Sequence, residues 1–156
     1  MKYTIADIAR IIDAEQVPSA DRIIESILLD SRKVYEPANA VFFALKGPRR
    51  DGHQFIPELY KKGVRSFVIS EPVDQSLCPE ADLLEVFDTL VALQLLAAHH
   101  RRQFDIPVIG ITGSNGKTII KEWLFQLLND DYNIIRSPKS YNSQIGVPLS
   151  IWPMNE

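Results

Sequence analysis

The sequence lacks the features that mark several large classes of protein. It has 156 residues and a single cysteine, Cys78, so no internal disulfide can form and a disulfide-framed domain is excluded. No run of about 18 apolar residues occurs, so we expect no membrane span. There is no basic excess either, because 17 Lys and Arg face 20 Asp and Glu, which argues against a nucleic-acid-binding protein. These absences favour a cytoplasmic globular protein.

Helix-like and strand-like segments alternate along the chain, which predicts an α/β fold. At the first helix, Thr4 followed by Asp7 has the spacing of a capping box. The expected helices are 4–13, 53–62 (closed by Gly63), 88–104, 117–129 and 145–152. The expected strands are 23–29, 41–45, 67–70, 83–87, 107–112 and 133–136.

The third helix ends in His99 and His100, followed by two arginines. Positive charge in a last turn complements the helix dipole, and we favour this interpretation of both histidines over a metal site. No cysteine or spaced acidic cluster nearby completes a ligand set.

The predicted elements divide into two domains, residues 1–86 and 87–156. The first is a small N-terminal α/β domain. The second is the start of a mostly parallel sheet, with only two strands before the sequence ends. Because a parallel sheet needs more strands and two covered faces, we expect this chain to be a fragment of a longer protein.

A glycine-containing loop lies where the predicted strand 107–112 meets the predicted helix 117–129. Residues 110–118 read GITGSNGKT. Glycines let backbone N–H groups turn toward an anion, and a helix N-terminus adds partial positive charge. The spacing departs from GxxxxGK[ST], since Ile111 stands where the first glycine is expected and Gly110 is one position early. The predicted phosphate-binding residues are Thr112, Gly113, Ser114, Asn115, Gly116, Lys117 and Thr118.

The TGSNGKT loop resembles the phosphate loop of the Mur ligases, the ATP-dependent amide-forming enzymes of peptidoglycan synthesis, and of the related folylpolyglutamate synthetases. Two other stretches resemble the Mur branch. Asp30-Ser31-Arg32 and VFFALKGPRRDGH (41–53) resemble its uridine-nucleotide-binding N-terminal domain. SYNSQIGVP (140–148) resembles the members that add D-alanyl-D-alanine, although Ser143-Gln144 departs from the Asn-Asp common there.

The resemblance implies that residues 1–86 bind the UDP end of a UDP-MurNAc-peptide. The implied contacts are Ser31, Arg32, Lys46, Asp51, Gly52 and His53, with Arg49 and Arg50 adding cations for a diphosphate. It also implies that Asn142 and Gln144 contact the muramoyl group or support a metal site. Local alternatives stay open: an internal ion pair in 30–32, a turn with a helix cap in 51–53, and an Asx turn at Asn142.

The resemblance further implies ATP and Mg²⁺ as cofactors and a reaction through an acyl phosphate. Lys117 and Thr118 are the implied catalytic residues, with Thr118 as a metal ligand. The implied substrates are UDP-MurNAc-tripeptide and D-alanyl-D-alanine, and we expect a monomer. We expect no turnover from this chain alone, because later family residues are missing. Alternatives are a ligase that adds the third peptide residue and a non-catalytic nucleotide-binding module.

Overall fold

The computed structural model describes residues 2–19, 21–48, 50–137 and 143–155. The chain forms two compact units, Met1–Leu96 and Ala97–Glu156, and the division falls within one helix. The predicted domain boundary at residues 86 and 87 lies ten residues earlier and stays a prediction. The predicted α/β class is confirmed by the elements described below.

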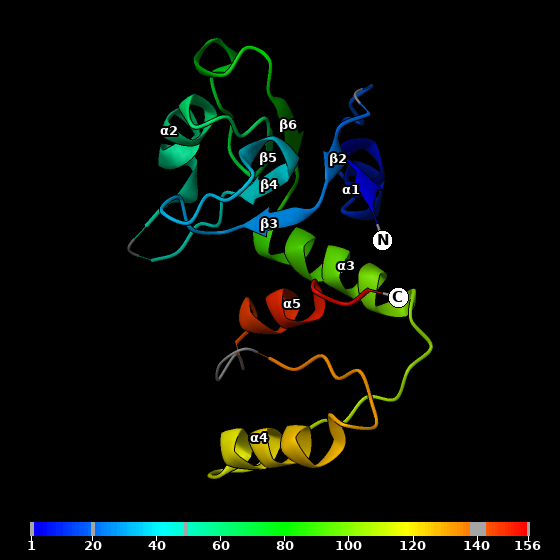
Figure 1. The fold of residues 1–156 in the computed structure, drawn as a ribbon. Helices are drawn as coiled ribbons and strands as arrows, with labels where there is room; N and C mark the ends of the chain where they lie inside the picture. Colours follow the sequence, from blue (N-terminus) through cyan, green and yellow to red (C-terminus); the bar gives the residue numbers. More distant parts are fainter. Residues whose placement is uncertain (1, 20, 49, 138–142, 156) are drawn as a thin grey trace. The chain divides into compact units, whose positions relative to one another are not determined.

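The first unit contains a four-stranded parallel sheet (Figure 1). Its strands pair in chain order, with Leu28 opposite Phe42, Phe42 opposite Phe67, and Phe67 opposite Leu83. The strands are β3 (Ser26–Leu28), β4 (Ala40–Phe43), β5 (Ser66–Ile69) and β6 (Asp82–Glu85). Because all four are parallel, the loops that follow them emerge at one edge.

The predicted strand 23–29 is wrong as a single element, because it is divided between two sheets. Its first part, β2 (Ile23–Ile24), pairs antiparallel with β1 (Tyr3–Thr4), and its second part is β3. Glu25 separates the two parts, and its backbone N–H donates to the Asn39 carbonyl at 2.8 Å. The backbone N–H and C=O groups of β2 bond to β1, and those of β3 bond to β4.

Helices in the first unit begin and end with local signals that the sequence contains. In α1 (Ile5–Ile11), the Thr4 hydroxyl accepts from the Asp7 N–H and the Asp7 carboxylate accepts from Thr4, so the predicted capping box is confirmed. The predicted helix 53–62 is a 3₁₀ turn, η2 (Gly52–Phe55), followed by α2 (Ile56–Lys61). Short 3₁₀ turns also occur at η1 (Pro37–Asn39) and η3 (Gln75–Leu77). Phe42 and Phe67 meet edge-on at the centre of the core.

Helix α3 (Thr89–Arg102) runs from the first unit into the second, and Asp88 caps it by accepting from two backbone amides. The second unit also contains α4 (Lys117–Leu128) and α5 (Gly146–Ile151), as the sequence predicts. The predicted strands 107–112 and 133–136 are wrong, because these residues have no regular secondary structure. A strand exists only when it pairs with another, and no strand pairs with either segment in the described part of this unit. Among the described helices, none is long and apolar enough to cross a membrane.

Candidate functional site

A cavity of about 590 Å³ opens at the carboxyl edge of the sheet in the first unit. The residues that follow β3 and β4 form two of its sides, and η2 and α2 close another. Open parallel sheets bind ligands at this edge. The lining residues are Leu29, Asp30, Ser31, Arg32, Phe42, Leu45, Arg50, Gly52, Gln54, Phe55 and Glu58.

Asp30 and Arg32 form a two-point ion pair on the wall of this cavity. The Arg32 side chain donates to the two Asp30 oxygens at 2.9 and 2.7 Å, and the Arg32 backbone N–H donates to Asp30 at 3.0 Å. These bonds hold the pKa of the Asp30 carboxyl well below its usual range. The internal ion pair considered from the sequence is therefore present, and it engages both the guanidinium and the backbone N–H of Arg32.

Ser31 and Arg50 are two polar residues that line the cavity. Ser31 is buried, and the Lys62 ammonium holds its carbonyl at 3.0 Å. Arg50 is exposed on the cavity wall and supplies a cation there. Arg49 lies outside the described residues.

Gly52 is required by the close approach of its backbone to the end of β4. Its N–H donates to the Leu45 carbonyl at 2.9 Å, and an added Cβ would lie 2.7 Å from the Ala44 carbonyl carbon. No larger side chain fits without moving backbone. Gly52 therefore shapes the cavity wall, and its contact with a substrate stays a prediction.

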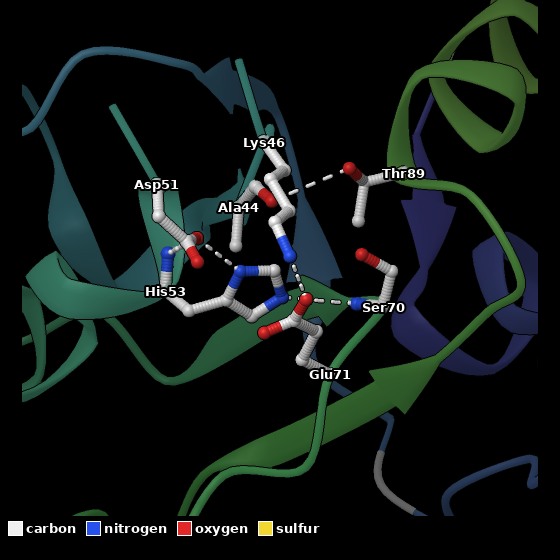
Figure 2. A network of polar contacts seen from close by, with 7 residues as sticks. All are labelled: Ala44, Lys46, Asp51, His53, Ser70, Glu71 and Thr89. Carbon is white, nitrogen blue, oxygen red and sulfur yellow. Dashed lines mark hydrogen bonds and ion pairs between the residues drawn. The ribbon is translucent and has the colours of Figure 1, made fainter. Parts of the chain in front are cut away.

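Three other predicted substrate contacts do not line the cavity but bind one another and the end of β5 (Figure 2). Lys46 pairs with Glu71. The His53 ring lies between the Asp51 carboxylate and the Ser70 backbone N–H, and Asp51 also caps η2 by accepting from the His53 N–H at 2.9 Å. These two bonds from His53 lower the pKa of Asp51. The turn-and-cap alternative for residues 51–53 is thus present in the structure.

The predicted phosphate loop of the second unit has an irregular backbone that ends at the first turn of α4. Gly113 has φ +145° and Gly116 has φ +79°, conformations that favour glycine. Residues 112–116 are exposed, and the Lys117 ammonium folds back to donate to the Gly113 carbonyl. The loop thus presents backbone and an ammonium group at the N-terminus of a 12-residue helix.

Thr118 follows Lys117 in the first turn of α4 and is exposed. Its hydroxyl is a hard oxygen ligand of the kind that Mg²⁺ accepts. The described residues contain no cluster of three or more His, Cys, Asp or Glu.

Two predicted contacts follow the phosphate loop in the sequence. Gln144 lies exposed in the turn before α5, where the neighbouring Ser143 hydroxyl accepts from the Gly146 N–H at 3.0 Å. Asn142 lies outside the described residues. The roles of both remain predictions.

The interpretation of His100 as a cation that complements the helix dipole is wrong, because the residue is 2% exposed. It contacts the carbonyl of Met154 at 3.0 Å and packs against the rings of Phe104 and Trp152. Burial lowers the pKa of His100, which favours the neutral ring. The apolar surroundings, which only the tertiary structure supplies, override the helix dipole.

Comparison with known proteins places these features in a family. A model described as the Mur ligase family, catalytic domain, matches residues 23–101. The chain belongs to the Mur ligase family. A curated Mur ligase relative, a UDP-N-acetylmuramoyl-tripeptide–D-alanyl-D-alanine ligase from Synechocystis, is 40% identical over 133 residues, covering 85% of this chain and 29% of the relative.

Solved Mur ligases share the fold. A crystal structure of MurF from Acinetobacter baumannii matches 99% of this chain and 34% of its own, with a TM-score of 0.87 and 30% identity. MurF from Thermotoga maritima in complex with ADP matches 85% of this chain and 30% of its own, with a TM-score of 0.72 and 32% identity. The chain spans about a third of the length of these relatives.

Several site residues carry no strong sequence signal. Gln54, Phe55 and Glu58 line the cavity from η2 and α2, and Lys62 supports Ser31 from beyond α2. All four residues lie in the predicted helix 53–62, where their residue types are common and do not indicate a binding site. Only the packing of α2 against the sheet brings them to the cavity.

Proposed function

We propose that this chain is the nucleotide-binding part of a ligase that adds D-alanyl-D-alanine to UDP-MurNAc-tripeptide at the expense of ATP. The observation that carries the proposal is the loop before α4, where Gly113 and Gly116 have positive φ values and the Lys117 ammonium lies against the Gly113 carbonyl. The relatives that share this chain's fold support the choice of reaction, since they are named for it. The same names give no support to a ligase for the third residue.

The cavity of the first unit suits the uridine diphosphate end of the substrate. Phe55, which is half-buried, offers aromatic surface for a base, and Ser31 offers a hydroxyl. Arg50 supplies a positive charge for a phosphate, and guanidinium binds phosphate by strong charge-assisted hydrogen bonds. Arg32 takes a lesser part, because Asp30 already engages its guanidinium.

The phosphate loop of the second unit suits the phosphates of ATP. The backbone N–H groups of residues 113–117 would hold the β-phosphate, and the Lys117 ammonium would leave the Gly113 carbonyl for the β- and γ-phosphates. The Thr118 hydroxyl would hold Mg²⁺ together with phosphate oxygens. Such a metal, when bound, neutralises phosphate charge.

The reaction brings two anions together, a substrate carboxylate and the γ-phosphate. The carboxylate attacks the γ-phosphorus, forming an acyl phosphate and releasing ADP. The amine of D-alanyl-D-alanine then attacks the acyl carbon and expels phosphate as the amide forms. Lys117 lowers the barrier by neutralising charge on the transferring phosphoryl group, and the loop amides fix its position.

Binding measurements on this chain test the two sites separately. Lys117→Ala removes a charged partner of phosphate, a loss of about 1.5–3 kcal/mol, so ADP affinity should fall about 10- to 100-fold. UDP affinity should stay unchanged in this variant. Arg102→Ala removes an exposed cation from α3 and is the matched control for ADP.

Arg50→Ala makes the reciprocal test, since it should weaken UDP and leave ADP unchanged. Lys33→Ala is its control, because Lys33 is an exposed cation near the same cavity. A wild-type chain that binds ADP but shows no affinity for UDP would instead support a non-catalytic nucleotide-binding module. The ligase step itself requires phosphate release from ATP that depends on D-alanyl-D-alanine, in a protein that carries this chain with the rest of the relatives' length.

A further inference from the structure

The His53 ring uses both of its nitrogens inside the protein (Figure 2). Nε2 lies 3.0 Å from the Ser70 backbone nitrogen, and Nδ1 lies 2.6 Å from Asp51 Oδ1. The His53 side chain is 10% exposed. A ring engaged in this way has no nitrogen left to donate to a substrate.

The partners of His53 fix its tautomer. A backbone N–H can only donate, so Nε2 must accept from Ser70 and carries no proton. A carboxylate oxygen can only accept, so Nδ1 must carry the proton and donate to Asp51. The Nδ1–H tautomer is the one form of the ring that satisfies both partners.

These bonds connect two segments that are far apart in the sequence. Asp51 ends the loop between β4 and η2, His53 lies in η2, and Ser70 directly follows β5. The same pair of segments is joined a second time by the ion pair between Lys46 and Glu71. The loop is therefore attached to the end of β5 at both of its ends.

The attached loop is the one that forms a wall of the cavity. Its turn is closed by the Gly47 N–H, which donates to the Arg50 carbonyl at 2.8 Å, and by the bridge between Lys46 and Asp51. Arg50 and Gly52 both line the cavity. Any movement of the loop away from β5 would displace these two residues together.

We propose that His53, held as the Nδ1–H tautomer between Asp51 and the Ser70 amide, is the positioning residue that fixes Arg50 and Gly52 against the cavity. This inference rests on the proposed function, because the ligand whose affinity reports the position is a uridine nucleotide. His53 acts on that ligand only through Arg50 and Gly52.

The first test is the protonation pattern of the wild-type chain. Long-range ¹H–¹⁵N NMR of the imidazole distinguishes the two nitrogens, and we expect the proton of His53 on Nδ1 at neutral pH, with and without UDP. A proton on Nε2, on the major form of the ring, would overturn the proposal. This measurement needs no variant and does not depend on ligand binding.

The second test is UDP affinity in a series at position 53. His53→Ala loses both bonds, His53→Asn keeps an amide that can donate to Asp51, and His53→Gln keeps an oxygen that can accept from Ser70. We expect the dissociation constant for UDP to rise about tenfold in the alanine variant, the factor that corresponds to one buried hydrogen bond, and less in the other two. If the alanine variant does not fold, the two amide variants are compared with wild type.

A core variant distinguishes positioning from general stability. Ile8→Val trims a buried side chain on α1, which takes no part in the described bonds of the loop, and should leave UDP affinity unchanged. Equal weakening by Ile8→Val, or unchanged affinity in all folded His53 variants, would overturn the positioning role and leave the proposed function intact. No UDP binding by the wild type would overturn the proposed function for this cavity, and the role of His53 with it.

Discussion

Replacing Gly52 by alanine tests the shape of the cavity wall most directly. The added Cβ would lie 2.7 Å from the Ala44 carbonyl carbon, 2.8 Å from Ala44 Cα and 2.8 Å from the Leu45 nitrogen. All three atoms belong to the backbone at the end of the central strand β4, so none can rotate away. Overpacking of this kind costs about 1–3 kcal/mol in the free energy of unfolding.

The expected loss can be converted into a melting temperature. The first unit spans Met1–Leu96, and in a domain of this size 1 kcal/mol corresponds to about 4–8 °C. We therefore expect the Gly52→Ala variant to melt about 5–20 °C lower, as followed by far-UV circular dichroism. UDP affinity should fall as well, because Gly52 lines the cavity.

The matched control is Gly47→Ala in the same loop. Among the described residues, its added Cβ would meet only the Arg50 carbonyl oxygen, at an ordinary contact distance of 3.6 Å. We expect a change within about 0.5 kcal/mol, as for other surface substitutions. Equal melting temperatures for the Gly52 and Gly47 variants would refute the steric reasoning.

Three further predictions concern other parts of the chain. Gly116→Ala forces a side chain into the left-handed region, at a cost of about 1–2 kcal/mol, and should weaken ADP binding in titration calorimetry. Gly110→Ala should not, because its added Cβ has no atom of the described residues within 4 Å. The lowered pKa of His100 means that the unfolded chain binds more protons, so stability should be full above about pH 6.5 and fall as the pH drops below it. In urea titrations followed by tryptophan fluorescence, His100→Asn should flatten this dependence and His99→Asn should not. Burial raises the pKa of the Cys78 thiol, so a thiol reagent should react with it only after unfolding, and rapid labelling of the folded chain would contradict the structure.

Local signals in the sequence were sufficient for many of the elements. The Thr4 and Asp7 capping box starts α1, and Gly63, at φ +102°, follows the end of α2. The turns of the predicted phosphate loop were also readable, because Gly113 and Gly116 adopt conformations that other residues avoid. In each case the deciding interactions lie within a few residues.

The sequence did not show which of the predicted site residues line the cavity and which bond to other parts of the protein. Lys46, Asp51 and His53 have the chemistry of ligand contacts, yet their nearest partners are Glu71, Ser70 and one another. The partner segment follows β5 and is distant in the sequence. Only the pairing of β4 with β5 brings the two segments together.

Sequence by itself determined where helices start, where glycine is needed and which segments are apolar, because these properties depend on neighbouring residues. Tertiary structure decided that 23–29 divides between two sheets, that 107–112 and 133–136 are not strands, and that His100 is buried. Strand pairing and burial depend on residues far along the chain, and no local pattern specifies which partner a segment will meet.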